Sequence, residues 1–191
     1  MGYNSTISLA YGQGVYAKTN NGISMNYRNK KINVFGSYSY AYRKAFNRLN
    51  LNRKFYQNNN YTGEYDQNNY LTIGYKNQIA RTGLDYFANE KNTFSILFSG
   101  VSNRFNPLGA NRSNVYDNAA NLNSHFETTN QSKDNWYNYS TNLNHKYIID
   151  TSASLSTDLD YAHFGNSTSQ NFTTRYYNLN NIEYLDPYLL Y

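Results

Sequence analysis

The residues of this chain with the greatest capacity for chemistry are three histidines and two neighbouring aspartates. His125, His145 and His163 are far apart in the sequence, so they form no local metal-binding motif. Asp158 and Asp160 are two residues apart and would share one face of a strand. Paired carboxylates catalyse glycoside hydrolysis in some enzymes. On a wet, polar face, however, they are better explained as solvated side chains or as partners of Lys or Arg.

No other catalytic or cofactor-binding motif occurs in the chain. There is no cysteine, which removes thiol nucleophiles and thiolate metal ligands. The sequence contains no nucleophile elbow, phosphate-binding loop or dinucleotide fingerprint, and Gly12-Gln13-Gly14 is too short to stand for one of them. We therefore expect no catalytic residue, no cofactor, no metal ligand and no enzymatic activity.

The composition describes a polar but weakly charged chain whose apolar surface is largely aromatic. Of the 191 residues, 39% are hydrophobic, 18% aromatic and only 15% charged, and there are 23 Tyr and 34 Asn. Disordered chains combine low hydrophobicity with high net charge and few aromatic residues, so we expect an ordered protein. The net charge of +5 is scattered along the sequence, which argues against nucleic acid as a partner.

Alternation of side-chain type identifies the elements that must position these residues. Residues 32–43 alternate between apolar or aromatic side chains and mostly small or polar ones. Successive side chains of a strand point to opposite faces, so this pattern predicts a strand with one aromatic face. Similar segments are residues 7–11, 23–27, 66–88, 93–105, 137–147, 155–162 and 170–180. No apolar run is long enough for a transmembrane helix.

The connections between these segments indicate the architecture. Short links at residues 29–31, 88–92 and 147–152 predict hairpin turns. Residues 51–69 and 103–133 are rich in Asn and weakly patterned, so we expect long loops there. Their rings and amides would suit ligand capture, although ordinary extracellular-loop chemistry is the better explanation. Short turns at one rim and long loops at the other are typical of outer-membrane barrels. The predicted fold is all-β: an antiparallel meander of about eight long strands, part of a large transmembrane β-barrel, or a curved open sheet if the chain is a fragment.

A lipid bilayer explains why one face is aromatic although aliphatic residues are too few for a core between two sheets. Lipid would cover the aromatic face and water would meet the polar face, with tyrosine rings buried and their hydroxyls hydrated. The membrane-facing candidates are Tyr38, Tyr40, Tyr42, Tyr86, Tyr137, Tyr139, Tyr147 and Tyr161. The lumen-facing candidates are Ser37, Ser39, Arg43, Asn138, Asn142, Asp158 and Asp160. A soluble antiparallel sandwich or barrel is the alternative that the pattern leaves open.

Several segments resemble barrel strands of TonB-dependent receptors of Bacteroidota, within the large outer-membrane β-barrel family. They include Ile7-Ser8-Leu9-Ala10-Tyr11-Gly12-Gln13-Gly14, Tyr38-Ser39-Tyr40-Ala41-Tyr42-Arg43-Lys44, Arg104-Phe105-Asn106-Pro107, Trp136-Tyr137-Asn138-Tyr139 and Asp158-Leu159-Asp160-Tyr161. The resemblance extends over residues 4–180, in strand order. It implies a location in the bacterial outer membrane, contact with outer-membrane lipid, and uptake of an extracellular nutrient.

The resemblance also implies parts that this sequence lacks. Receptors of this family have a signal peptide, a plug domain and about twenty-two strands, so we expect residues 1–191 to be a single segment of a transmembrane β-barrel, without plug domain or signal peptide. Its partners would be the remainder of its own barrel and plug and, through the missing plug segment, an energy-transducing inner-membrane complex. Two alternatives are a soluble tyrosine-rich β-protein that binds carbohydrate, and a small closed eight-stranded outer-membrane adhesin or anchor.

Overall fold

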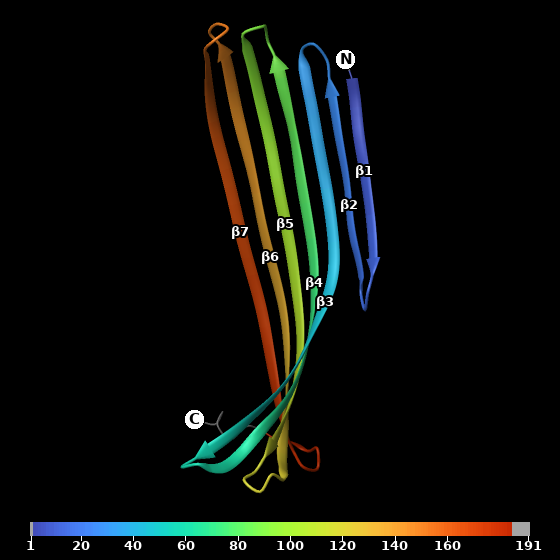
Figure 1. Cartoon of the computed structure of the whole chain (residues 1–191), viewed down its shortest axis with the longest axis vertical. Helices are drawn as coiled ribbons and strands as arrows, with labels where there is room; N and C mark the ends of the chain where they lie inside the picture. The colour runs from blue at the N-terminus through green and yellow to red at the C-terminus, as the bar shows by residue number, and fades with distance from the viewer. Residues whose placement is uncertain (1, 185–191) are drawn as a thin grey trace. The chain divides into compact units, whose positions relative to one another are not determined.

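The structure, a computed structural model, describes residues 2–184, and most of them lie in β-strands. The strands are β1 (Gly2–Gln13), β2 (Ala17–Arg28), β3 (Ile32–Gln57), β4 (Asn60–Phe87), β5 (Asn92–Tyr116), β6 (Leu122–Ile148), β7 (Ser154–Asn178) and β8 (Glu183–Tyr184). They form one antiparallel sheet in the order of the sequence (Figure 1). The predicted all-β antiparallel meander is therefore confirmed.

The two long loops predicted at residues 51–69 and 103–133 are wrong. Only Asn58 and Asn59 connect β3 to β4, and only residues 117–121 connect β5 to β6. The segments predicted separately at 155–162 and 170–180 fall, except for residues 179 and 180, in one strand, β7, and the eighth strand is the two-residue β8. Asn is depleted in most strands, so Asn-rich strands are easily mistaken for loops.

Asparagine or aspartate organises most of the turns. The Asn29 side-chain oxygen accepts hydrogen bonds from the backbone N–H groups of Lys31 and Ile32, each at 2.8 Å. Corresponding bonds in later turns are accepted by Asn89, Asp117, Asp150 and Asn178. Such side-chain bonds to the backbone are the reason that these residues favour turns. The short turns predicted near residues 29–31, 88–92 and 147–152 are confirmed.

The chain forms two compact units, and each of the strands β3 to β7 contributes to both. Unit 1 contains Met1–Lys44, Tyr75–Phe105 and Asp134–Ser167, and unit 2 contains Ala45–Gly74, Asn106–Lys133 and Thr168–Tyr191. No single cut in the sequence separates the units. Within unit 1, the segments of β3 to β7 are about 13 to 15 residues long.

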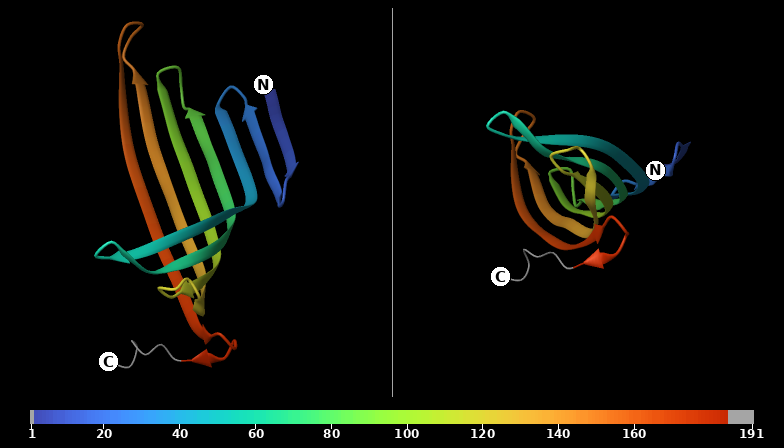
Figure 2. Two further views of the ribbon diagram at one scale, coloured as in Figure 1. Left: turned by 60° about the horizontal axis from the view of Figure 1, so that its bottom comes forward. Right: turned by 90° about the horizontal axis from the view of Figure 1, so that it is seen from below.

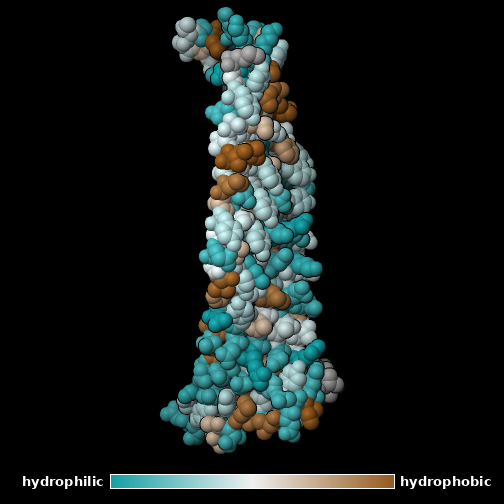
Figure 3. Space-filling model, turned by 90° about the vertical axis from the view of Figure 1, so that its right-hand side faces the viewer, coloured by the Kyte–Doolittle hydropathy of each residue, from teal (hydrophilic) through white to brown (hydrophobic). Residues whose placement is uncertain are grey.

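The described part of the chain has no hydrophobic core. No apolar side chain is fully buried in residues 2–184, and this part of the chain contains one sheet and no helix (Figure 2). Among its most exposed apolar side chains are Leu9 and Leu159, at 79% and 66%. Viewed onto the β1 edge, hydrophobic residues are interspersed with many of intermediate hydropathy (Figure 3). Residues 2–184 contain no helix that could span a membrane.

Candidate functional site

Strand register gives unit 1 a continuous apolar face. Ile7 of β1 lies opposite Ile23 of β2, and Ile23 lies opposite Tyr38 of β3. The Tyr38 hydroxyl donates a hydrogen bond to Gln78 of β4 at 2.9 Å, so β4 continues the same face. Alternation along the strands places the eight tyrosines predicted to share a face on it: Tyr38, Tyr40, Tyr42, Tyr86, Tyr137, Tyr139, Tyr147 and Tyr161. We call this the apolar face of unit 1.

The opposite face, the polar face of unit 1, is connected across strands by side-chain hydrogen bonds. Asn33 of β3 donates to Asp85 of β4 at 2.8 Å, and Ser95 of β5 donates to the same carboxylate at 2.7 Å. The predicted polar residues Ser37, Ser39, Arg43, Asn138, Asn142, Asp158 and Asp160 lie on this face by strand parity.

Asp158 and Asp160 link β6 to β7. Asn142 donates to Asp160 at 2.7 Å, and Asn144 donates to Asp158 at 2.8 Å. Both carboxylates are exposed on the polar face. The two carboxylates are thus exposed, as expected for solvated side chains, and they accept hydrogen bonds from neutral amides instead of pairing with Lys or Arg.

The three histidines each contact a different aromatic side chain. Each stacks against an aromatic ring: His125 on Tyr177 at 4.8 Å, His145 on Phe94 at 4.4 Å, and His163 on Tyr137 at 5.9 Å between ring centroids. Within residues 2–184, no three His, Asp or Glu side chains gather where they could hold a metal ion. The histidines therefore contribute ring packing between strands.

Charge is distributed differently on the two faces of unit 1. In the described residues, the charged side chains on the apolar face are Lys44, Lys76 and Arg104. All three lie within two residues of a limit of unit 1, so the middle of this face carries no charge. The polar face, by contrast, carries charges from Lys18 at one end to Asp158 towards the other.

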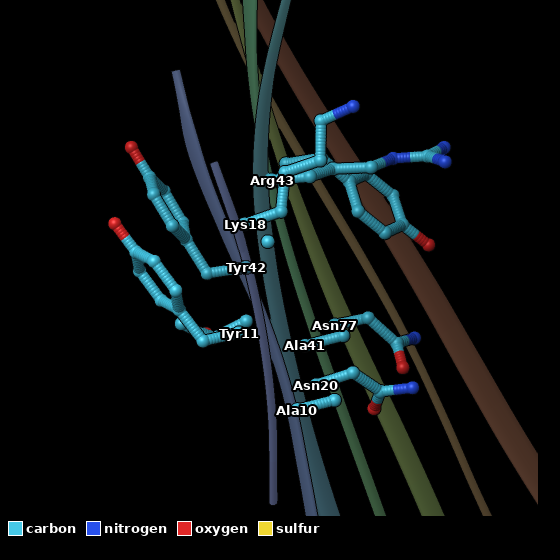
Figure 4. A pocket seen from close by; sticks show the side chains of 11 residues that line it. Ala10, Tyr11, Lys18, Asn20, Ala41, Tyr42, Arg43 and Asn77 are labelled. Carbon is cyan, nitrogen blue, oxygen red and sulfur yellow. The ribbon is translucent and has the colours of Figure 1, made fainter. Parts of the chain in front are cut away.

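The polar face contains a cavity of about 600 Å³ close to the turn between β1 and β2. Its lining residues come from β1, β2, β3 and the first residues of unit 1 in β4. Lys18 lies directly opposite Arg43 in the register of β2 and β3. In Figure 4, Lys18, Arg43, Asn20 and Asn77 point to one side of the strands, whereas Tyr11 and Tyr42 point to the other. The cavity therefore belongs to the polar face and is basic.

Ring and amide contacts hold Arg43 in this cavity. The guanidinium carbon lies 4.8 Å from the centroid of the Tyr75 ring, a cation–π distance. The Tyr75 hydroxyl donates to Asn103 Oδ1 at 2.9 Å, and Asn77 Nδ2 donates to the same oxygen at 2.6 Å. Because Asn103 fixes both neighbours, the surroundings of Arg43 are ordered without any acidic side chain.

Unit 2 contains a second cavity, of about 400 Å³, that no charged residue lines. Its lining includes the amides of Asn47, Asn69, Asn111 and Asn130, the Thr128 hydroxyl, and the apolar side chains of Leu49, Leu71 and Phe172. Asn111 Nδ2 donates to Asn69 Oδ1 at 2.7 Å, and Asn69 Nδ2 donates to the Leu49 carbonyl at 3.1 Å. Amides donate and accept hydrogen bonds as hydroxyl groups of a ligand require, and Phe172 adds a ring.

Two features of these cavities lie outside the predicted site. The sequence predicts Arg43 on the polar face, but its cross-strand partner Lys18 is not among the predicted site residues. The position of the turn at Lys30 and Lys31 indicates this pairing. Residues equally far from a hairpin turn lie opposite each other, as Lys18 and Arg43 do. The cavity in unit 2 could not be predicted, because much of its lining, including Asn69, Asn111 and Asn130, lies in the segments predicted as loops.

Comparison with protein-family models gave no match, and comparison with curated protein sequences gave no significant similarity.

Proposed function

We propose that unit 1 is a wall of strands that crosses the bacterial outer membrane, and that the chain forms part of the barrel of a TonB-dependent transporter for an extracellular nutrient. The observation that carries this proposal is the apolar face of unit 1, which is uncharged in its middle and exposes apolar side chains such as Leu9 and Leu159. In this function the chain forms a passage and makes no chemical bond. The family resemblance of the sequence supplies the transporter class.

The length of the strands in unit 1 supports a membrane crossing. Segments of about 13 to 15 residues, at about 3.3 Å per residue and tilted by about 40°, extend about 30 to 40 Å along the membrane normal. The hydrocarbon core of a bilayer is about 30 Å thick, and about 40 to 45 Å with its headgroups. Lys44, Lys76 and Arg104 would then lie at one headgroup level, where cationic side chains are tolerated.

The unpaired edges of the sheet suggest that further strands extend it on both sides. In the described residues, β1 pairs with β2 alone and does not close onto β7 or β8. Backbone groups in hydrocarbon must all be paired, so both edges of unit 1 require neighbouring strands in the membrane. This favours a large barrel over a closed barrel made of these eight strands.

Lysine substitution on the two faces tests the membrane assignment. Tyr40→Lys and Tyr139→Lys place a charge on the apolar face, and each should reduce insertion of the full chain into lipid vesicles, with a cost of about 2 to 4 kcal/mol near the bilayer centre. The neighbours Ser39→Lys and Asn138→Lys place the same charge on the polar face and serve as matched controls. Insertion is measured by heat-modifiable electrophoresis and protection from protease.

The four lysine variants give different results if the apolar face contacts lipid and if it does not. Loss of insertion in the two tyrosine variants, with insertion retained in both controls, supports it. Equal insertion of all four variants, or a monomeric chain that remains soluble without detergent, would overturn the membrane assignment.

A soluble or surface carbohydrate-binding protein is the second candidate, favoured by the uncharged cavity of unit 2. Phe172→Ala should then weaken binding of a neutral oligosaccharide, measured by calorimetry on the full chain. Phe164→Ala is the matched control, because Phe164 lies on the same strand outside that cavity. Absence of oligosaccharide binding by the unaltered chain would remove this candidate.

A further inference from the structure

The basic cavity on the polar face of unit 1 has a charge arrangement that the barrel function leaves unexplained. Lys18 and Arg43 are direct cross-strand partners, and like charges in this relationship destabilise a sheet. The ion pairs found among the described residues are Lys54 with Glu64, Arg112 with Glu127, and Arg175 with Glu183. None of them involves Lys18 or Arg43, so no carboxylate in residues 2–184 pairs with either cation to offset this repulsion.

The N–H groups of Arg43 are available to a ligand. Its guanidinium carbon lies 4.8 Å over the Tyr75 ring, and among the described residues no hydrogen bond or ion pair engages the guanidinium. The N–H groups around the edge of a guanidinium are the ones that bind a carboxylate or phosphate through two parallel hydrogen bonds. Lys18 projects to the same side of the strands (Figure 4) and can add a third charged donor.

The surrounding residues leave space for a ligand between these cations. Ala10, Gly12 and Ala41 line the cavity with small side chains or none, and a Cβ at Gly12 would meet no atom within 4 Å. Asn20 lines the same space and adds an amide donor.

We propose that this cavity binds the oxyanion group, carboxylate or phosphate, of a small solute, with Arg43 as the bidentate donor and Lys18 as the second cation. The ligand offsets the repulsion between the two cations, so binding also strengthens the pairing of β2 with β3. The proposal goes beyond the barrel function, because the polar face and its cavity exist whether or not the opposite face contacts lipid.

The experiment measures binding of three probes to the full chain in detergent micelles, at constant ionic strength with chloride as background. Inorganic phosphate and acetate distinguish the two oxyanions, and glucose is the uncharged control. Binding is followed by NMR shifts of the Lys18 Nζ and Arg43 Nε groups and by calorimetry. We expect one or both anions, but not glucose, to saturate the shifts of both side chains.

Three substitutions separate a specific site from a general effect of charge. Lys18→Gln and Arg43→Gln should each weaken anion binding about tenfold or more, the loss of one charge-assisted hydrogen bond. Arg28→Gln is the matched control, because this substitution removes the same charge from the polar face. Arg28 also lies over an aromatic ring, at 5.3 Å from the Phe87 centroid, but its cross-strand partner is the neutral Asn33. It should change the affinity less than twofold. Arg43→Lys keeps the charge and loses the two-pronged geometry, so its affinity should be intermediate.

Two outcomes would overturn the proposal. One is the absence of saturable shifts with both anions in the unaltered chain. The other is equal weakening by Arg28→Gln, which would mean that net charge alone attracts the ions. All of these variants should insert into lipid as the unaltered chain does, so a failure of the oxyanion site and a failure of the membrane assignment give different results.

Discussion

Tyr65 of β4 and Phe126 of β6 approach to 6.0 Å between ring centroids, although β5 lies between their strands in the sheet. Flat neighbouring strands are about 4.8 Å apart, so rings two strands away meet only where the sheet is strongly curved. Phe55 lies 5.0 Å from Tyr65, and Tyr176 lies 5.8 Å from Phe126. Within unit 2, these four rings form a row on the concave side of the sheet.

Truncation of this row should loosen unit 2. Phe126→Ala removes contacts to Tyr65 and Tyr176, each of which is worth about 0.5 to 1.5 kcal/mol beyond the area that it buries. We expect the free energy of opening of β4 to β6 in unit 2 to fall by about 1 to 3 kcal/mol, measured by hydrogen–deuterium exchange. Tyr65→Phe keeps the ring and should leave exchange unchanged. Unaltered exchange in Phe126→Ala would contradict a stabilising role for the row.

The ring of Phe35 packs against the backbone of Gly83. Phe35 is a large ring on the polar face, and it lies where a Cβ on Gly83 would be. Gly83→Ala should therefore displace the ring and lower the free energy of unfolding by about 1 to 3 kcal/mol, as overpacking does. Urea unfolding in detergent micelles measures the change.

Two further variants test whether the contact with Phe35 causes the effect of Gly83→Ala. Gly12→Ala adds a methyl group where no atom lies within 4 Å, and its effect should stay within about 0.5 kcal/mol. In a Phe35→Ala background, Gly83→Ala should cost much less, because the collision is gone. Additive effects of the two substitutions would rule out the contact as the cause.

The turn between β3 and β4 depends on two left-handed residues. Asn58 and Asn59 have φ angles of 48° and 64°, as a two-residue type I′ hairpin turn requires, and Asn is one of the few residues that tolerate them. Asn59→Val should destabilise the hairpin by about 1 to 2 kcal/mol, whereas Asn59→Gly should be tolerated. Proteolysis at this turn provides the measurement. Equal susceptibility of both variants would contradict the turn type.

Acidification should weaken the turn between β6 and β7. Hydrogen bonds from the Ser152 backbone N–H, and then from its hydroxyl, hold the pKa of Asp150 below that of an ordinary aspartate. A depressed pKa in the folded state means stability that is present above the ordinary pKa and is lost as the pH falls through the lower, folded value. A carbon-detected NMR titration of the Asp150 carboxyl should show this low midpoint.

Ser152→Ala removes the hydroxyl bond and leaves the backbone bond. It should raise the Asp150 midpoint part of the way towards the ordinary value. A midpoint that does not move would show that the Ser152 side chain has no effect on the carboxylate.

The sequence predicted the fold where apolar and polar residues alternate cleanly. Residues 32–43 predicted a strand and its two faces, and the register of β2 and β3 places Tyr38 and Ser39 on opposite faces. It failed where polar side chains line both faces of a strand, as in residues 51–57, because alternation then carries no signal. The run Asn58-Asn59-Asn60 is a turn signal, but it lies inside the segment predicted as a loop, residues 51–69.

The chain by itself determined that one side of the sheet would be aromatic and the other hydrated, since the two-residue period of a strand follows from local backbone geometry. Only the tertiary structure decided that Lys18 faces Arg43, that Tyr65 reaches Phe126 across an intervening strand, and that four distant amides line one cavity. These relationships depend on strand register and on curvature of the sheet, which arise from contacts between segments far apart in the sequence.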